Sequence, residues 1–291
     1  MKKILITGGS GFIGRNLTEA LSGKYKIFAP AHSQLELLDY KALEQYVLTH
    51  QIEVVIHAAI HVPMFHGADK EFFNDMQMFL NLEKLSYYVE KVLYFGSGAE
   101  YDKRYDIRMA KEEGIGKTIP VSEYGLAKYI MNKLARASDN IYNLRLFGIF
   151  GKYELWNIKL ISNLCCKAVF GLPLTVRREC WFDFLFIEDL PDIVTWFIEH
   201  QPHFHDYNVC HGTEYQLTEL AHLVREASGK ELPITLLNEE RNLDYSADNS
   251  RMRTEMEKLH ITPMRRAVTQ LYQYYDTHRD RIDFEALKAS R

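Results

Sequence analysis

The sequence predicts an α/β protein built on a doubly wound parallel sheet, and three observations support this prediction. A short apolar segment near the N-terminus runs into a glycine-spaced turn and then into an amphipathic helix. Strand-like and helix-like segments alternate from there to about residue 150, as they do when helices connect parallel strands. Beyond that residue the alternation changes, which predicts a smaller C-terminal α/β region intertwined with the first.

The first strand and the first helix enclose a turn that suits a phosphate group. Residues 4–6 are expected to form a buried strand, and glycines follow at positions 8, 11 and 14. Gly8 suits a turn with positive φ, Gly11 lets backbone amides approach an anion, and Gly14 lets the helix pack close to the sheet. The free amides at the start of the helix would then bind a pyrophosphate. This Rossmann-type elbow predicts that a dinucleotide binds here.

The remaining elements of the first half follow in a regular order. Further strands are expected at residues 26–29, 53–56, 91–95 and 141–146. Helices are expected between them at residues 40–48, 70–89 and 124–138. Ligands of such a sheet bind beyond the carboxyl ends of its strands, so polar residues at those ends are candidates for a site.

The second half contains fewer clear elements. They are a strand at 181–187, a helix from about 188 to 200, a strand at 207–209, a helix at 217–227 that Gly229 ends, and a last long helix from Pro263. We therefore expect a dinucleotide-binding domain at residues 1–150 and a substrate domain at residues 151–291. The segment 182–212 is expected to return to the first domain.

Composition excludes several classes of function. The formal net charge of -4 gives no electrostatic argument for a nucleic acid or an anionic membrane as partner. No run of about 18 apolar residues is present, so we expect no membrane span. The four cysteines lack metal-binding spacing and are expected to be buried thiols of a cytoplasmic protein. We expect no metal site.

A tyrosine and a lysine one helical turn apart carry the expected chemistry. Tyr124 and Lys128 fall on one face of the helix expected at 124–138. A free phenol has a pKa near ~10, and a nearby cation favours the phenolate and lowers that value. Tyr124 would then exchange a proton with a carbonyl or hydroxyl oxygen, while Lys128 would also hold a ribose of the cofactor.

Ser97 is the expected partner of Tyr124. It follows the strand at 91–95 directly, at the edge of the sheet where ligands bind. Its hydroxyl would contact the same substrate oxygen as the phenol. Gly96, Gly98 and Ala99 make this turn small, and we expect the turn to leave space for a substrate.

Together these motifs resemble the extended short-chain dehydrogenases/reductases of the NAD-dependent epimerase/dehydratase family, most of whose members modify nucleotide sugars. The resemblance implies that Ser97, Tyr124 and Lys128 form the catalytic triad. It also implies that Asp39 reaches the adenine. The further residues that it places at the cofactor are Gly8, Gly11, Phe12, Ile13, Gly14, His57, Ala58 and Ala59. Softer matches cover residues 145–151, 182–189 and 207–209.

Departures from the family pattern narrow the expected reaction. Dehydratases of the family carry an Asp-Glu pair just after the catalytic hydroxyl, and Gly98 and Ala99 stand there instead. Other members epimerise sugar carbons through a cysteine and a histidine. In this chain Ala99 and Tyr153 stand at those two positions, so the resemblance does not support that step. What remains is the set of residues that the resemblance assigns to hydride transfer. These residues would serve a 4-keto-sugar reductase or a 4-epimerase with tightly held NAD. A non-catalytic NAD(P)-binding sensor is an alternative from another functional class.

The expected cofactor is NADP(H) rather than NAD(H). NAD-selective members commonly place an acid at the end of the second strand, and residues 28–33 contain none. Arg15, with His32 or Ser33, would instead accept a 2′-phosphate. A preference for NADPH favours a reductase, because epimerases of this family usually retain NAD.

Substrate contacts and partners follow from the same resemblance. The nucleotide sugar is expected to meet a small set of residues, namely Gly98, Phe147, Arg177, Arg178 and Arg251. Arginine suits a pyrophosphate because its planar guanidinium offers several donors. The family usually has an asparagine where Gly148 stands, so one contact is missing or replaced. A homodimer is expected to form through the helices at about 70–89 and 123–138.

Overall fold

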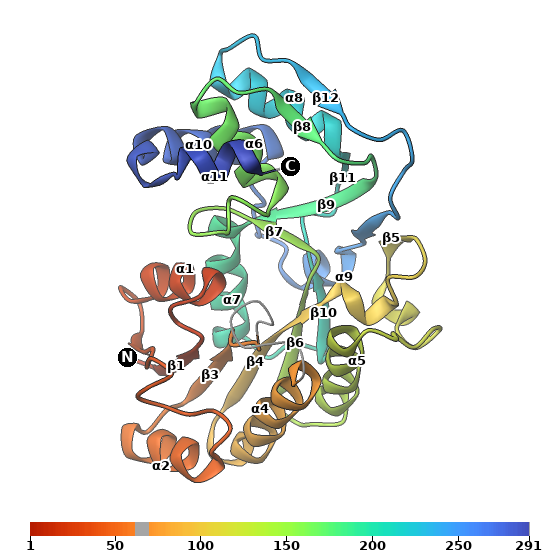
Figure 1. The fold of residues 1–291 in the computed structure, drawn as a ribbon. Coiled ribbons are helices and arrows are strands. Elements are labelled where there is room, and N and C mark those ends of the chain that lie inside the picture. Colours follow the sequence, from red (N-terminus) through yellow and green to blue (C-terminus); the bar gives the residue numbers. More distant parts are fainter. Residues whose placement is uncertain (62–69, 291) are drawn as a thin grey trace.

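The largest element of the fold is a parallel sheet of six strands (Figure 1). The computed structural model describes residues 1–61 and 70–290. The strand order is β10-β6-β4-β3-β1-β2, and every pair of neighbours is parallel. These strands are β1 (Lys3–Thr7), β2 (Lys26–Phe28), β3 (Val54–His57), β4 (Lys91–Ser97), β6 (Ile141–Leu146) and β10 (Asp206–Val209). The predicted doubly wound sheet is confirmed.

Helices cover both faces of this sheet, because successive strand residues point to opposite sides. Ile4 and Ile6 belong to one buried cluster, together with residues of α1 (Phe12–Leu21) and α7 (Leu190–Glu199). Leu5, which lies between them, belongs to the cluster on the other face. The helices of that face are α2 (Tyr40–His50), α4 (Glu71–Leu85) and α5 (Glu123–Arg136).

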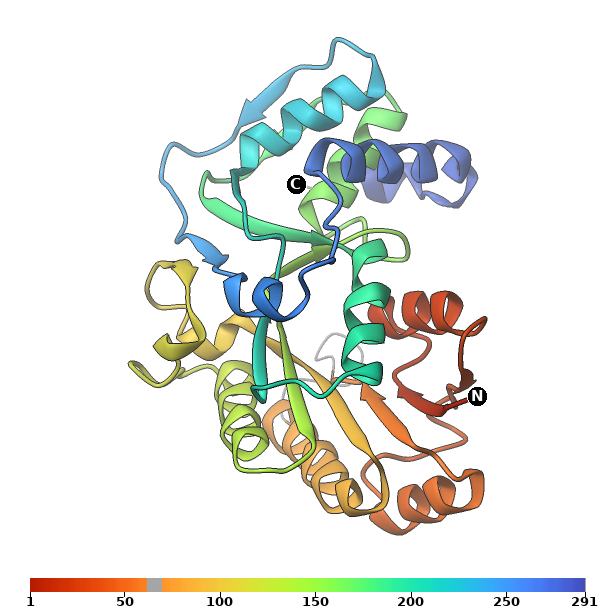
Figure 2. The ribbon, with the colours of Figure 1, turned by 180° about the vertical axis from the view of Figure 1, so that it is seen from behind.

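The remaining elements form a second layer, to which residues 107–110 and 148–150 of the N-terminal half also contribute (Figures 1 and 2). Its main sheet has the order β11-β9-β13-β5, and β7 also pairs with β9. These strands are β5 (Ile107–Ala110), β7 (Gly148–Phe150), β9 (Trp181–Phe186), β11 (Glu214–Gln216) and β13 (Tyr245–Ala247). A two-stranded sheet pairs β8 (Leu174–Val176) with β12 (Ile234–Leu236). The helices are α6 (Leu160–Val169), α8 (Leu217–Ser228), α9 (Ser250–Glu255), α10 (Met264–Thr277) and α11 (Phe284–Ala289).

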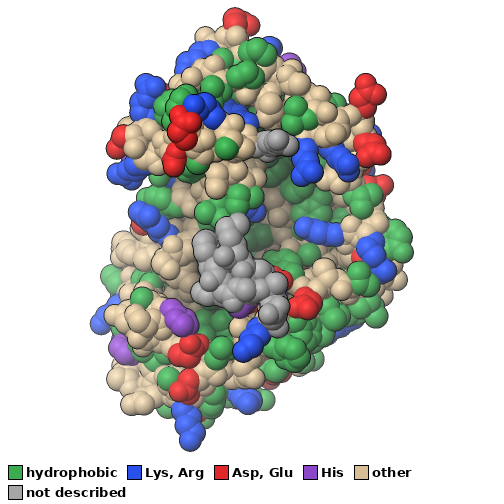
Figure 3. Space-filling model, in the orientation of Figure 1, with side chains coloured by type: hydrophobic (Ala, Val, Ile, Leu, Met, Phe, Trp, Pro, Cys, Tyr) green, Lys and Arg blue, Asp and Glu red, His purple; other side chains and the backbone are tan. Residues whose placement is uncertain are grey.

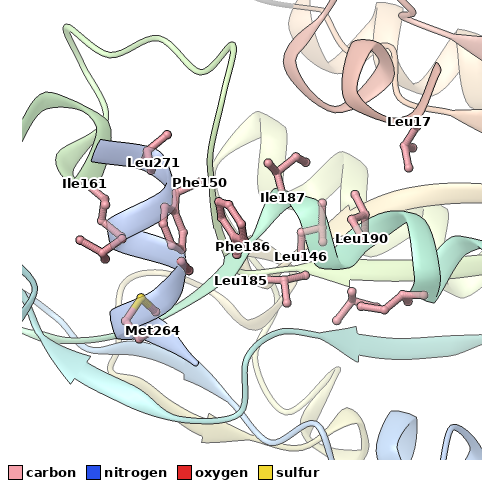
Figure 4. Packing of buried hydrophobic residues seen from close by; sticks show 14 of the residues in the cluster. Leu17, Leu146, Phe150, Ile161, Leu185, Phe186, Ile187, Leu190, Met264 and Leu271 are labelled. Carbon is pink, nitrogen blue, oxygen red and sulfur yellow. The ribbon is translucent and has the colours of Figure 1, made fainter. Parts of the chain in front are cut away.

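The two parts share one hydrophobic core. Figure 4 shows Phe150 and Phe186 beside Ile161 and Leu271, which belong to α6 and α10. The same cluster continues to Leu17 on α1, under the large sheet. Such a continuous core explains why no flexible linker separates the parts.

The chain crosses between the two parts several times. Within the segment 182–212, residues 206–209 join the large sheet as β10, whereas residues 182–186 belong to the second sheet as part of β9. The domain boundaries therefore stay predictions. Within the described part of the chain, no helix combines the length and the apolar character that a membrane crossing requires.

Candidate active site

The glycine elbow has the backbone that its spacing predicts. Gly8 adopts φ +69°, and its carbonyl accepts a hydrogen bond from the Gly11 amide at 2.9 Å. A Cβ on Gly14 would lie 2.2 Å from that carbonyl oxygen, so only glycine lets α1 start so close to β1. No side chain caps α1, and its first turn carries no acidic residue. This helix start therefore suits an anion.

A cavity of about 630 Å³ opens beside the elbow. Its lining includes residues from the ends of β1 and β3 and from the segment before α2, among them Gly8, Gly11, His32, Glu36, Ala58 and Ala59. This position, at the carboxyl ends of parallel strands, fits a dinucleotide. The molecule is also hollowed between its two halves on the face drawn in Figure 3, beside the grey atoms.

His57 supports the floor of this site and does not line the cavity. Its Nδ1 lies 2.7 Å from the Thr7 hydroxyl, across the β1–β3 pair. Burial, with the positive charge of Lys128, lowers the pKa of His57 to about 3. The imidazole is therefore neutral at physiological pH and serves as a hydrogen-bonding group.

The structure brings Ser97, Tyr124 and Lys128 together. Ser97 ends β4, and its hydroxyl stabilises the phenolate form of Tyr124, which counteracts part of the rise in the pKa of that phenol. The Ser122 side chain caps α5, so Tyr124 and Lys128 stand one turn apart at the start of that helix. Lys128 Nζ lies 5.7 Å from the centre of the Tyr124 ring and donates to the Phe95 carbonyl at 3.1 Å.

The expected lowering of the Tyr124 pKa is wrong. Burial raises the pKa of Tyr124 to about 12, and the hydrogen bond from Ser97 offsets only part of this rise. Burial also lowers the pKa of Lys128. Desolvation is the largest cause of both shifts because both side chains lie inside the protein. Tyr124 is therefore a protonated phenol at neutral pH.

Glu100 is a site residue that motif matching missed. Its Oε1 accepts the Ser97 amide at 3.1 Å, while the Ser97 hydroxyl accepts the Ala99 amide at 3.2 Å. Arg145 Nε donates to Glu100 Oε2 at 2.7 Å, and both side chains are fully buried. This buried ion pair fixes the turn η2 (Gly98–Tyr101) that follows Ser97. A carboxylate three residues after a serine is a capping-box pattern, so the sequence did contain a signal.

The space expected beside Gly98 for a substrate is filled. A Cβ on Gly98 would lie 2.5 Å from the Tyr245 phenol oxygen and 2.7 Å from the Phe147 ring. Gly148 is similarly enclosed, since a Cβ there would lie 2.5 Å from the Asp183 carbonyl oxygen. Both glycines therefore serve close packing against the second sheet.

The residues expected to choose the cofactor are dispersed. Arg15 stacks on the Tyr153 ring at 3.6 Å and pairs with Glu19 at 3.2 Å. His32 lines the cavity but pairs with Glu36 at 2.8 Å. Glu36 lies beyond the segment 28–33 in sequence, yet the fold brings this acid into the same cavity.

Two further residues expected at the cofactor stand outside the residues that line this cavity. Asp39 caps α2 and accepts the amides of Lys41 and Ala42. Ser33 is exposed. Contacts of these two residues with a cofactor stay predictions.

The three arginines expected at the substrate lie in different surroundings. Arg178 follows β8 and pairs with the exposed Glu240 at 3.1 Å, and Arg177 is exposed beside it. Arg251 on α9 is engaged by protein groups, among them Asp206 at 3.1 Å. A pyrophosphate would have to displace these partners of Arg251. The substrate contacts therefore stay predictions.

Comparisons with known proteins agree with this fold. The model of the family described as NAD dependent epimerase/dehydratase matches residues 4–210. GDP-L-colitose synthase of Yersinia pseudotuberculosis is 27% identical over 253 residues, which cover 78% of this chain and 82% of that protein. The GDP-L-fucose synthetase of Naegleria fowleri bound to NADP superposes with a TM-score of 0.83 at 17% identity, over 96% of this chain and 94% of that one. The GDP-mannoheptose C4 reductase of Campylobacter jejuni with NADP bound gives a TM-score of 0.78 at 18% identity, over 94% and 98%.

Proposed function

Because the chain belongs to the NAD-dependent epimerase/dehydratase family, we propose that it is a nicotinamide-dependent oxidoreductase that reduces the 4-keto group of a nucleoside-diphosphate sugar. One observation carries this proposal. Ser97, at the end of β4, and Tyr124, at the start of α5, interact at the sheet edge that also carries the glycine elbow. Gly98 and Ala99, in contrast, offer no acid or base. The site thus has the groups for proton and hydride transfer and lacks, at these two positions, the groups that remove water.

Each residue of the triad has a separate task in this reaction. A bound nicotinamide supplies the hydride. Tyr124, protonated because burial raises the pKa of its phenol to about 12, donates its proton to the carbonyl oxygen as that oxygen gains charge. Ser97 donates a hydrogen bond to the same oxygen, and Lys128 holds the ribose. A protonated phenol suits reduction, since oxidation of an alcohol requires the phenolate first.

The relatives support a guanosine diphosphate sugar as the substrate. GDP-L-colitose synthase and the GDP-mannoheptose C4 reductase both carry this nucleotide in their names. We propose NADPH as the reductant, with Arg15 and His32 turned toward its 2′-phosphate. The alternative of a 4-epimerase remains an outcome of the experiment below, as does the alternative of a sensor.

Turnover of a GDP-linked 4-keto-6-deoxyhexose tests the proposal. The protein should consume NADPH in proportion to the keto sugar, and proton NMR should show one new hydroxyl-bearing stereocentre at C4. Interconversion of two GDP-hexoses without net NADPH consumption would instead assign an epimerase. Tight NADPH binding with no turnover of either sugar type would assign a sensor.

We also expect a homodimer that forms through α4 and α5. The two helices pack side by side on one face of the large sheet. Phe73 on α4 and Tyr87, which follows it, are largely exposed. Sedimentation velocity measures the oligomeric state, and a monomer would contradict this expectation.

A further inference from the structure

A lysine stands beside the turn that begins at Ser97. Lys103 comes two residues after the end of η2, and its Nζ lies over the Tyr245 ring, 4.5 Å from the ring centre. The phenol oxygen of Tyr245 adjoins Gly98 in turn, since a Cβ added there would lie 2.5 Å from this oxygen. One phenol ring therefore separates the Lys103 ammonium from the backbone next to Ser97.

The backbone that carries Lys103 is held in place. Asp102 adopts φ +71°, a conformation that residues with a side chain rarely adopt. Its buried carboxylate accepts hydrogen bonds from the Arg104 amide at 3.2 Å and from the Arg104 guanidinium at 2.7 Å. Lys103 thus lies between two residues that bind each other, and this turn keeps it beside the site.

The charge of Lys103 is not neutralised by the protein. The acids that flank Lys103 and β13 in sequence are bound to arginines, because Asp102 pairs with Arg104 at 2.7 Å and Asp244 pairs with Arg241 at 3.5 Å. Lys103 itself is exposed, and it forms no ion pair and no hydrogen bond with any residue that the structure describes. One positive charge is therefore left over at this edge of the site.

The surroundings of Lys103 favour an anion. Although the side chain is exposed, desolvation lowers the pKa of its ammonium, and the positive charge of Lys159, the residue before α6, adds to this lowering. An anion beside Lys103 would offset both effects, because it favours the charged form of the lysine. The segment between β4 and β5, yellow in Figure 1, lies where the two parts of the chain meet, so a ligand held between them can reach it.

We propose that Lys103 binds the diphosphate of the nucleotide sugar. The proposal rests on the proposed function and names a contact of its substrate. The sugar must reach Ser97, and the diphosphate is bonded directly to that sugar, so both lie in the same part of the site. A lysine ammonium attracts phosphate as a compact point charge. Two of the three arginines expected for this contact, Arg178 and Arg251, pair with acids of the protein instead.

Titration with GDP tests this contact and needs no turnover. NADPH is present at saturation, so that the cofactor site is filled. Lys103→Met keeps an unbranched side chain and removes its charge. We expect it to raise the Kd of GDP about 10-fold in isothermal titration calorimetry, as for loss of one hydrogen bond between charged groups. Lys103→Arg keeps the charge and should bind GDP within about 3-fold of the wild type.

Lys117→Met is the matched control. Lys117 is also an exposed lysine, in the segment between η3 (Glu112–Gly114) and α5. Its loss should leave the Kd of GDP unchanged. In a separate titration the Kd of NADPH should change less than about 2-fold in Lys103→Met, because we expect the phosphates of the cofactor at the glycine elbow. Equal Kd values of GDP for Lys103→Met and the wild type would overturn the proposal, and so would an equally large rise in the Kd of NADPH.

Parallel titrations with UDP and dTDP separate this inference from the proposed function. A contact with the diphosphate does not depend on the base. Binding of UDP or dTDP in place of GDP would refute the guanosine of the proposed substrate, and the effect of Lys103→Met on that nucleotide would still decide the inference. Absence of keto-sugar reduction by a wild-type protein that binds GDP would refute the proposed function alone. If the wild type binds none of the three nucleotides, the role of Lys103 is refuted as well.

Discussion

At the scale of single residues, burial sets the protonation states around Ser97. It raises the pKa of the Tyr124 phenol to about 12 and lowers that of the Lys128 ammonium. It also keeps the His57 imidazole neutral, with a pKa of about 3. The desolvation cost falls on the charged form of each group. The site therefore favours an acid at position 124 over a base.

Removal of the Tyr124 phenol oxygen should stop the reaction and spare binding. We expect Tyr124→Phe to lower kcat by about two orders of magnitude or more, since a positioned proton donor contributes that much. The Kd of NADPH should change little. Stopped-flow measurement of NADPH oxidation gives kcat, and fluorescence titration gives Kd. Near-normal turnover by this variant would exclude the assigned role.

Cofactor choice should depend on the acid that the fold brings into the cavity. Glu36 pairs with His32 there, and a carboxylate repels a 2′-phosphate. We expect a lower Kd for NADPH than for NADH in the wild type, and Glu36→Gln should widen the difference about 5-fold. Arg15→Ala should reduce the difference between the Kd values for NADPH and NADH. Titration of all three proteins with both cofactors is the measurement, and equal Kd values in the wild type would contradict the preference.

At the scale of elements, the elbow shows how one contact fixes the meeting of a strand and a helix. The start of α1 lies against the Gly8 carbonyl, where a side chain has no room. The helix start is thereby aimed at the cavity beside β1. Similarly, η2 holds Ser97 because Glu100 is anchored by Arg145 of the neighbouring strand β6.

A single methyl group at the elbow should therefore strongly weaken cofactor binding. Gly14→Ala places a Cβ 2.2 Å from the Gly8 carbonyl oxygen, so α1 must shift away from β1. We expect the Kd of NADPH to rise at least about 100-fold. Gly23→Ala is the control, because nothing lies within 4 Å of a Cβ there. Isothermal titration calorimetry on both variants checks the effect, and similar Kd values for the two would contradict it.

Much of the large sheet follows from the sequence, whereas most of the second part does not. Apolar runs such as residues 54–57 are buried on both faces and leave a clear pattern. The missed strands, among them β7, β8, β12 and β13, span only three residues each and pair over long sequence distances. Such segments are too short to show a period.

The residues of the candidate site show the same contrast between local sequence patterns and long-range contacts. Ser97, Tyr124 and Lys128 belong to local motifs next to long elements, so their neighbourhood could be predicted. Tyr245 and Glu36 enter through tertiary packing, which no spacing in the sequence encodes.

At the scale of the whole molecule, the ionisation of buried carboxyl groups lowers the free energy of unfolding. Glu154, in the segment between β7 and α6, is 7% exposed and accepts a hydrogen bond from the Ser162 hydroxyl at 2.6 Å. Burial raises the pKa of Glu154 to about 7. A carboxyl group with a raised folded-state pKa stabilises the fold below its unfolded pKa, and this contribution is lost as the pH rises through the folded value.

The free energy of unfolding should accordingly fall between about pH 4.5 and pH 7. We expect Glu154→Gln to reduce this fall by an amount on the order of 3 kcal/mol, because an amide does not ionise. Urea denaturation at both ends of this pH range measures the effect. The exposed Glu231, changed to glutamine, is the control and should leave the slope unchanged. An identical slope for Glu154→Gln would show that this carboxyl does not titrate in the fold.

The edge strand β10 has a consequence for biosynthesis. During translation β6 is synthesised well before residues 206–209, so one edge of the nascent sheet is unpaired until β10 emerges. During that interval Arg145 also lacks Asp206, the later of its two carboxylate neighbours. A polypeptide truncated at residue 150 would retain this unpaired sheet edge and would tend to aggregate through it. Synthesis through residue 209 is thus what completes the large sheet.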